Sequence, residues 1–440
     1  MLGQFLRDVK EYFIRRILLI PPTLIGITML VFLIMRLVPG GPMEEDLKKL
    51  MGQSEGKSMK SRETSGFHLK PEMLMQLAGE YDRDKSHFRH YLEWLGAVPR
   101  DVSKSAALFE DGAMSAEVKI PGTTKSLRVT RQPNGSARLE GIDGSEVADW
   151  HVRIQTRDDQ WRLWKAYVPG AKEMPAETKD RAEIYRSEFA GLLQGRLGIS
   201  RRYQDPVALM IRERMPISLF YGIVEIILIY GICLPLGIVK AIKHRSWFDN
   251  LSSIAVFAGY AIPGYALGAL LVVYVCAPGH FPMGGFVSDD FADLSAWGKI
   301  KDLFHHAAMP LVCYLVGAFA MMTMMVKNSL MDHLAADYVR TAIAKGVSFP
   351  RAVFRHALRN SLIPLATTIG NNVSMLVAGS MFIEKIFDIN GFGLLQFNAL
   401  VERDEYVIMG TLTIAALLML IGNVISDVAV ALVDPKIRFD

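Results

Sequence analysis

The chain has 440 residues, of which 51% are hydrophobic and 21% are charged, and its mean hydropathy is +0.22. The apolar residues are gathered into long runs, which is typical of membrane proteins rather than soluble ones. The net charge of +4 is too small to indicate nucleic-acid binding, and the three cysteines show no disulfide or metal-ligand spacing.

The N-terminus begins with about 16 basic, mildly amphipathic residues, followed by an apolar run over 17–38. A secretory signal peptide would have a shorter apolar core and a small-residue cleavage site after it. Here the run is about one bilayer crossing long and ends at Arg36 and Pro39-Gly40-Gly41-Pro42, which predicts an uncleaved first span. Five further spans are expected near 217–240, 252–276, 307–326, 361–384 and 407–432.

The orientation of these spans follows from lysine and arginine, which are retained on the cytoplasmic side near span ends. With the N-terminus inside, the basic residues that fall in the cytoplasm are Arg7, Lys10, Arg15, Arg16, Lys240, Lys243, Arg245, Lys436 and Arg438. The acidic residues that fall outside are Asp289, Asp290, Asp293, Asp302, Asp388, Glu402, Asp404 and Glu405. The sequence therefore predicts an all-α polytopic protein of six transmembrane helices with both termini in the cytoplasm.

A polar segment over 41–205 separates the first two spans and is expected outside the cytoplasm. Residues 72–79 and 87–95 have helical spacing, whereas the period changes to two from 116 to 168. The alternating pairs are Val118 and Ile120, Leu127 and Val129, Ala137 and Leu139, Val152 and Ile154, and Trp161 and Leu163. With a turn at Gln132-Pro133-Asn134-Gly135, these runs predict a small antiparallel β module. A helix over 176–193 is expected to lead back to the membrane. The expected divisions are 1–40, 41–205 and 206–440.

Several motifs that could carry chemistry are better explained otherwise. Gly52-Gln53-Ser54-Glu55-Gly56-Lys57-Ser58 has one residue too few between its glycines for a phosphate-binding loop, and no strand precedes it. His87 with His90, and His305 with His306, have no third metal ligand placed by the sequence. We therefore expect no catalytic residue and no metal site.

Polar residues inside the expected spans are costly in hydrocarbon, so they face protein or water. The candidates for a translocation path are Glu225, Asn371 and Asn372, joined by Met321 and Met325 from a methionine-rich patch in the fourth span. Asn423 and Asp427 are similar polar residues in the sixth span. Packing between helices of one chain is an equal alternative for the polar residues, and filling space between helices is the commoner use of such methionines. Pro263 is expected to kink the third span.

The stretch over 337–364 is amphipathic and basic, although apolar spans flank it on both sides. Helix formers run to Lys345, and Gly346 can end a helix in the left-handed region. Ser348 and Pro350 then predict a second helix, whose apolar face would hold Val353, Phe354, Ala357 and Leu358. The pattern suits either a rigid element gripped by a soluble partner or a basic loop lying on anionic lipid.

The same stretch, DYVRTAIAKG followed by FRHALRNSLIP, resembles the cytoplasmic coupling loop of ABC-importer permeases in the binding-protein-dependent peptide family. The likeness is to the B-type subunit of dipeptide/oligopeptide permeases, and nearest to the branch that imports longer peptides such as microcin C. Three other stretches match in the same order: 39–42, 383–404 and 433–438. The resemblance covers 1–43 and 186–440 but not the β module. It departs from the general importer motif, which begins Glu-Ala-Ala, because Arg340, Thr341 and Ala342 stand there.

The resemblance implies two sets of functional residues. Those expected to couple to an ATPase, within a loop over 328–360, are Asp337, Tyr338, Arg340, Thr341, Ala342, Lys345, Gly346 and Arg355. Those of an outer loop between the last two spans are Glu384, Gly391 and Gly393.

It also implies a non-catalytic permease subunit in the bacterial cytoplasmic (inner) membrane that forms half of a peptide pathway. The implied partners are a second homologous permease, two ATP-binding subunits, a periplasmic or extracellular substrate-binding protein and membrane lipid, but no nucleic acid. No cofactor is expected on this chain, since ATP-Mg would bind the ATPase.

The β module would rest against the binding protein or decorate the outer face. The alternatives are a permease for nickel or another small solute and, more remotely, a secondary transporter, although the halves show no self-similarity. A membrane-anchored binding or signalling protein would not explain the structured loop and five further spans.

Overall fold

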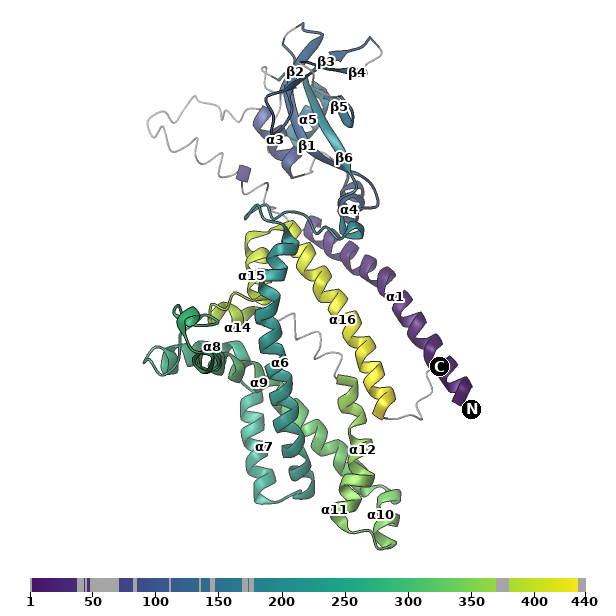
Figure 1. Ribbon diagram of the computed structural model, residues 1–440, viewed down its shortest axis with the longest axis vertical. Helices are drawn as coiled ribbons and strands as arrows, with labels where there is room; N and C mark the ends of the chain where they lie inside the picture. Colours follow the sequence, from purple (N-terminus) through teal and green to yellow (C-terminus); the bar gives the residue numbers. More distant parts are fainter. Residues whose placement is uncertain are drawn as a thin grey trace. The chain divides into compact units, whose positions relative to one another are not determined.

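The computed structural model describes residues 2–37, 43, 46–47, 71–81, 85–110, 112–133, 136–142, 147–167, 173, 178–368 and 380–433. The chain divides into two compact units (Figure 1), one of Met1–Leu30 with Ile199–Asp440 and one of Val31–Gly198.

The first unit is helical, and its long apolar helices fit membrane spans. These helices are α1 (Leu2–Leu37), α6 (Val207–Ile242), α9 (Ala296–Ala335) and α16 (Glu405–Val433). A bent pair is formed by α7 (Trp247–Tyr260) and α8 (Gly264–Leu271), which runs into a π-turn at Val272–Cys276. Among the described residues, four helices are long and apolar enough to cross a membrane, or five if the bent pair is one span. The expected fifth span includes residues 369–379, which lie outside the described ranges.

The third expected span is broken rather than gently kinked. The axes of α7 and α8 differ by 86° across a break of three residues that ends at Pro263. Pro263 lacks an N–H, and the residue before a proline avoids the helical region, so a helix ends here readily. Gly264 then lies so close to α9 that an added Cβ would be 2.4 Å from the Cys313 carbonyl oxygen.

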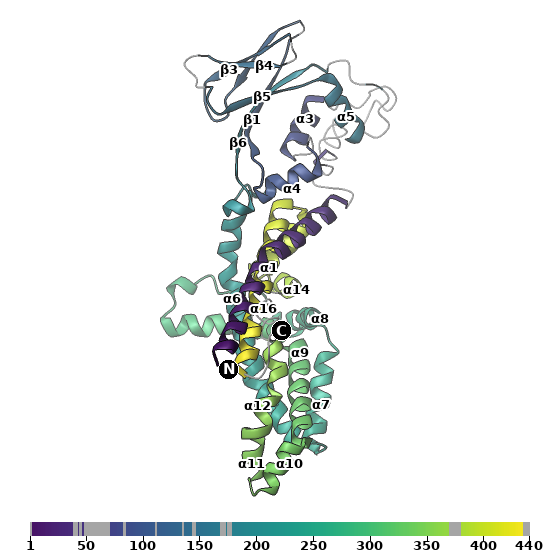
Figure 2. The same cartoon turned by 90° about the vertical axis from the view of Figure 1, so that its right-hand side faces the viewer.

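The helices α6 and α9 pack closely along their length, as the two views in Figures 1 and 2 show. At Gly237 an added Cβ would be 2.6 Å from the Cβ of Val326. A small residue thus permits close backbone approach, a common device between membrane helices. Near α1, Asp427 of α16 accepts a hydrogen bond from Tyr12 (3.2 Å) and pairs with Arg16, so this acidic residue joins two helices of one chain.

The described residues of the second unit form six strands: β1 (Arg100–Leu108), β2 (Ser115–Lys119), β3 (Ser126–Arg131), β4 (Ala137–Gly141), β5 (Trp150–Gln155) and β6 (Arg181–Glu188). They form two antiparallel three-stranded sheets in the orders β1-β6-β5 and β2-β3-β4. Alternating residues of both sheets make one core, in which Val118, Leu127, Val129 and Ile184 are fully buried. The helices are α3 (Pro71–Glu80), α4 (His87–Leu95) and α5 (Arg157–Tyr167).

Two expectations about this unit are wrong. Trp161 and Leu163 lie on α5 rather than on a strand, because Trp164, three residues after Trp161, is buried against α3 and favours the helical period. The helix expected over 176–193 is replaced by β6, which is the central strand of its sheet. Asn134 and Gly135 of the expected turn lie outside the described residues, but β3 and β4 on either side pair as a hairpin.

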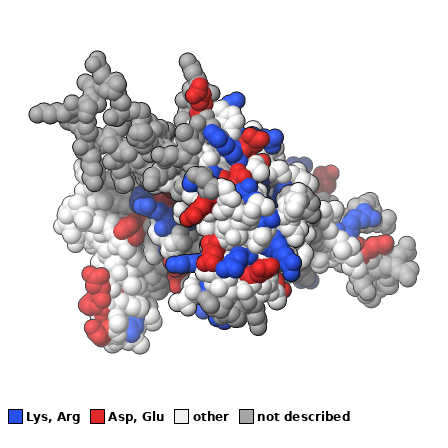
Figure 3. Space-filling view, turned by 90° about the horizontal axis from the view of Figure 1, so that it is seen from above, with Lys and Arg blue, Asp and Glu red and all other residues white. Residues whose placement is uncertain are grey.

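Charged side chains of both signs are interspersed over the face seen in Figure 3. Three charged side chains are instead buried together inside the second unit: the Lys85 Nζ lies 2.7 Å from a carboxylate oxygen of Glu93 and 3.1 Å from a carboxylate oxygen of Asp101. Because Lys85 lies between α3 and α4 and Asp101 is the second residue of β1, this group ties the helical part of the unit to its sheet. Buried charges persist only where they are paired in this way.

Candidate functional site

The basic stretch forms a compact chain of short helices that follows α9. It comprises α10 (Asp337–Ala344), α11 (Phe349–Ala352), a π-turn at Val353–Ala357 and α12 (Leu358–Ser361). Figures 1 and 2 both place α10 and α11 at one end of the helical unit, beside the last turns of α6 and α9. We call residues 337–361 the coupling segment.

The first helix of this segment, α10, ends in the geometry expected of a glycine-terminated helix. Gly346 has a φ of +89°, and its N–H donates to the Ile343 carbonyl at 2.9 Å. The Val347 N–H donates to the Ala342 carbonyl at 3.2 Å, which completes a Schellman motif. The expected role of Gly346 as the helix end is therefore confirmed, and the motif fixes the direction in which the chain leaves α10.

The second helix begins at the expected place but exposes more apolar surface than expected. Ser348 is extended at the N-cap, and Pro350 lies in the first turn, where its missing N–H costs nothing. Val353 and Ala357 are fully buried, whereas Phe354 is 60% exposed. The expectation that Phe354 shares the buried face is wrong, because the π-turn rotates the side chains relative to a regular α-helix.

A small apolar cluster anchors the segment to the long helices. Its buried members are Ala241 of α6, Leu330 of α9, and Val339, Ala352, Val353 and Ala357 of the segment itself. Five of these side chains are fully buried, and Ala241 is 5% exposed. Two hydrogen bonds add to this anchor. The Asn360 Nδ2 donates to the Tyr338 hydroxyl (3.2 Å), which links the two ends of the segment, and the same hydroxyl is hydrogen-bonded to His333 of α9 (3.0 Å). The segment is therefore packed against both α6 and α9.

The outward face of the segment is basic with apolar side chains between the charges. Arg340, Thr341, Lys345, Gly346 and Arg355 are exposed, as are Asp337 and Tyr338, and Ala342 is partly buried. The exposed apolar side chains are Ile343 (41%), Phe349 (47%) and Phe354 (60%). Basic and apolar groups mixed on a rigid base suit the groove of a protein partner, in which aromatic anchors supply most of the affinity.

The outer-loop residues Glu384, Gly391 and Gly393 are brought together around one carboxylate. Glu384, in α14 (Met381–Ile386), is fully buried and accepts hydrogen bonds from the Leu394 N–H (2.7 Å) and the Ser218 hydroxyl (3.0 Å). The Leu394 N–H belongs to the first turn of α15 (Phe392–Glu402), where a carboxylate is favoured. A Cβ on Gly391 would lie 2.6 Å from a Glu384 oxygen, and one on Gly393 would lie 3.0 Å from its carboxyl carbon. Gly391 is thus required for the approach of Glu384, whereas a side chain at position 393 would force the Glu384 carboxylate to shift slightly.

The sequence did not single out two further members of this group. Ser218 of α6 accepts from the Phe392 N–H at 2.8 Å while it donates to Glu384. The Tyr314 hydroxyl of α9 accepts from the Ser380 N–H at 2.9 Å and lies 3.5 Å from a Glu384 oxygen. Both are polar residues in apolar helices, which is the signal that could have found them.

The three candidate path residues that the structure describes are not gathered into one lining. Glu225 is 8% exposed on the buried side of α6, Met321 is 67% exposed on α9, and Met325 packs against the cluster that includes Ile229 and Met322. Asn371 and Asn372 lie outside the described residues. Within the described ranges, no group of three or more His, Cys, Asp or Glu side chains could hold a metal ion.

Comparison with known proteins identifies relatives for the whole chain. The family model for a binding-protein-dependent transport system inner membrane component matches residues 233–439. The chain is 30% identical over 434 residues to the peptidoglycan transport system permease protein YejB of Agrobacterium fabrum, covering 98% of both chains. It is 34% identical to the oligopeptide transport system permease protein AppB of Bacillus subtilis, over 58% of this chain and 80% of that protein. It is 39% identical to the inner membrane ABC transporter permease protein YejB of Escherichia coli over 238 residues, which span 65% of that protein, slightly under two thirds.

The Agrobacterium alignment changes one expectation. Because it leaves out only 2% of this chain, it must include strands β1–β6. The expectation that resemblance stops at residue 43 and resumes near 186 is therefore too narrow for this relative, whereas the AppB match over 58% of the chain agrees with it.

Proposed function

Since the chain belongs to the family of binding-protein-dependent transport system inner membrane components, we propose that it is a membrane-spanning permease subunit of an ATP-driven peptide importer. Its relatives include permeases named for peptide, oligopeptide and dipeptide transport, and the chain is a multi-pass protein of the bacterial inner membrane. The observation that carries the proposal is the coupling segment, a pair of short helices seated on α6 and α9 with a basic and apolar outward face.

The orientation and the partners complete the proposal. We infer that both termini and the coupling segment face the cytoplasm and that the unit of Val31–Gly198 lies outside it. A second permease would complete the pathway, two ATP-binding subunits would engage the two coupling segments, and a binding protein would deliver substrate. ATP-Mg would bind to the ATPase, so this chain would contribute movement and not hydrolysis.

The proposed mechanism is alternating access. ATP closes the ATPase pair, the coupling segment moves with it, and the long helices change the side on which the pathway is open. A ligand shifts such an equilibrium only by its differential affinity for the two states, so a nearly complete switch needs about 5 kcal/mol. The apolar anchor on α6 and α9 is suited to transmit such movement because packed helices shift as units rather than deform.

The substrates we propose are peptides, including those released from cell-wall peptidoglycan. The supporting observation is that the relative named for peptidoglycan transport aligns over nearly the whole chain, including the strands of the second unit. Uptake of a labelled dipeptide, a labelled oligopeptide, a peptidoglycan-derived peptide and nickel by the reconstituted importer would rank these substrates. Preference for nickel over every peptide would contradict the proposal.

The coupling interface is tested by Phe354→Glu. Phe354 is 60% exposed, so the change should leave folding and membrane insertion intact. A charge in an apolar contact should weaken binding of the ATPase by about 2 kcal/mol or more, roughly 30-fold. Phe354→Leu, which keeps an apolar side chain, is the matched control and should retain most of the affinity. Equal recovery of ATPase with both variants and with the unaltered protein would favour the lipid-surface interpretation of this segment.

A further inference from the structure

Three charged side chains meet between α6, α7 and α9. The Lys327 Nζ lies 2.7 and 2.8 Å from the two carboxylate oxygens of Asp249, and the Lys240 Nζ lies 3.1 Å from one of them. Lys240 is fully buried, Asp249 is 2% exposed and Lys327 is 7% exposed. A group of charges this far from water is retained only if each member is paired, and removing one member leaves another charge buried without a partner.

The group is tied most extensively to the first turns of α7. Besides Asp249, the Lys240 ammonium donates to the Asp249 carbonyl (2.9 Å) and to the hydroxyls of Ser252 (2.7 Å) and Ser253 (2.8 Å). The Arg245 N–H donates to Asp249 Oδ2 at 3.1 Å, and the His244 Nδ1 lies 3.4 Å from the same oxygen, which Lys327 also contacts. One lysine from α6 and one from α9 therefore hold the same end of α7.

This end of α7 lies next to the anchor of the coupling segment but outside it. Lys240 directly precedes Ala241, and Lys327 lies about one helical turn before Leu330. Both Ala241 and Leu330 belong to the apolar anchor. In the part of the chain that the structure describes, the buried members of the anchor come from α6, α9, α10, α11 and the π-turn, and none from α7. The charged group is thus the polar contact that ties α7 to the helices of the anchor, in addition to the packing of α7 against α9.

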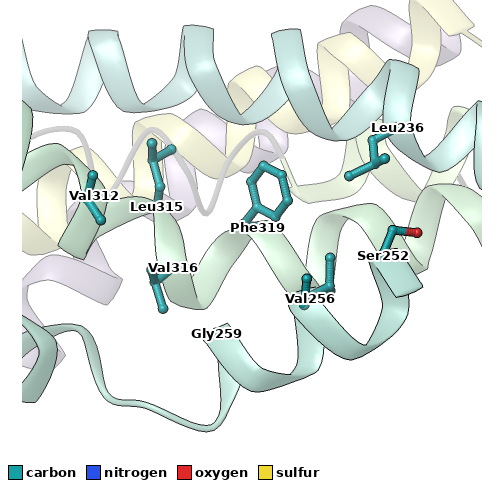
Figure 4. Close-up of a pocket in the computed structure, with 9 residues that line it drawn as sticks. Leu236, Ser252, Val256, Gly259, Val312, Leu315, Val316 and Phe319 are labelled. Carbon is teal, nitrogen blue, oxygen red and sulfur yellow. The ribbon is translucent and has the colours of Figure 1, made fainter. Parts of the chain in front are cut away.

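The rest of α7 is held less firmly. A cavity of about 320 Å³ lies between α6, α7 and α9 (Figure 4), lined by Leu236, Ser252, Val256, Gly259, Val316 and Phe319. Over this partly open pocket, α7 lacks the dispersion contacts with α6 and α9 that a filled interface would supply. At its other end α7 stops at Tyr260, where the chain turns by 86° into α8. The helix therefore has a break at one end, incomplete packing along its length and the charged group at the other end.

We propose that Lys240, Asp249 and Lys327 form a clasp that makes α7 follow the coupling segment during the transport cycle. The inference rests on the proposed function, because it assigns these residues as positioning residues for coupling ATP hydrolysis to transport. Movement of the segment reaches α6 and α9 through apolar packing and reaches α7 through the clasp. When the clasp opens, α7 turns about the break at Ala261–Pro263 into the cavity instead of following.

The test uses the complete importer in proteoliposomes, with ATP hydrolysis and peptide uptake measured on the same preparation. Asp249→Asn keeps the shape of the side chain but removes the charge that both lysines share. We expect normal assembly and stimulated ATP hydrolysis within about twofold of the unaltered importer, with the peptide transported per ATP reduced about tenfold. Asn250→Ala, at an exposed position on the same turn of α7, is the matched control and should leave this ratio unchanged.

A second variant separates the clasp from a simple folding requirement. Lys327→Met leaves the neutral pair of Asp249 with Lys240, so it should assemble normally and reduce the ratio by less than Asp249→Asn does. Spin labels at Leu251, an exposed residue of α7, and on α9 would report the distance between these helices with and without vanadate-trapped nucleotide. We expect trapping to change this distance less in Asp249→Asn than in the unaltered importer. An unchanged ratio in both variants, or a loss of uptake matched by a loss of assembled complex in both, would overturn the clasp. Failure of the proposed function would appear differently, as an unaltered importer that moves no peptide with ATP.

Discussion

Gly346 is held in its conformation by the backbone alone. Its φ of +89° is accessible at little cost only to glycine, and an added Cβ would meet no atom within 4 Å. Gly346→Val should therefore cost about 1–2 kcal/mol through backbone strain and redirect the second helix of the coupling segment, without disturbing the long helices. The expected result is normal membrane insertion with loss of substrate-stimulated ATP hydrolysis in the assembled importer.

The comparison variant is Gly346→Asn, since asparagine enters the left-handed region more readily than other side chains. It should keep most of the stimulation. If valine and asparagine behave alike, the direction set by the Schellman motif does not matter for coupling.

Glu384 is the residue on which the outer loop depends. Glu384→Leu removes the acceptor of the Ser218 hydroxyl and the Leu394 N–H, and a buried donor left unsatisfied costs about 1–3 kcal/mol. We expect a lower thermal unfolding midpoint in detergent, measured by intrinsic fluorescence. Asp289→Leu, at an exposed position between α8 and α9, should leave the midpoint unchanged, and an equal drop for both would refute this role.

In the second unit, the secondary structure of a segment depends on the strands with which it pairs. β6 pairs with β1 on one side and β5 on the other, and its Ala182 and Ile184 are fully buried in the shared core. Residues 85–198, expressed alone, should give a strand-rich circular dichroism spectrum and a cooperative melt. A random-coil spectrum would show that this segment needs the rest of the chain to fold.

The core of that module offers a sharper test. Leu127 is fully buried, so Leu127→Ala should destabilise the isolated module by about 2–5 kcal/mol in urea unfolding. Arg138→Ala, at an exposed position on β4, should change its stability by less than about 0.5 kcal/mol. Similar losses for both would mean that the two sheets do not share the core described here.

At the scale of the whole molecule, the proposed orientation can be tested by labelling. Thr124 and Ser348 are exposed, and the native cysteines are buried, so single cysteines at these two positions can be compared in a cysteine-free background. An impermeant thiol reagent added to spheroplasts should label position 124 and spare position 348 until the membrane is permeabilised. The reverse pattern would place the coupling segment outside and remove it from contact with ATPase subunits.

The sequence by itself determined the membrane class and the coupling segment. A bilayer crossing requires about 20 apolar residues in a row, so the long helices are visible in one dimension. The helix end at Gly346 and the helix start at Ser348 are also local, since a cap depends on residues within one turn. For the same reason the family resemblance could be read from short contiguous stretches such as 337–346.

Only the tertiary structure decided the elements and groups whose partners are distant in the chain. Residues 181–188 contain helix formers, yet Ala182 pairs with Ala107 and Ile184 with Ser105, so β6 is fixed by strands far from it. Ser218 precedes Glu384 by 166 residues, and Asp249 precedes Lys327 by 78. Intrinsic secondary-structure propensity contributes less than about 1 kcal/mol for an ordinary residue, whereas pairing a buried charge or completing a sheet changes the free energy of folding by several kcal/mol. No spacing rule could place these residues together, because folding brings them into contact only after the long helices and the sheets have packed.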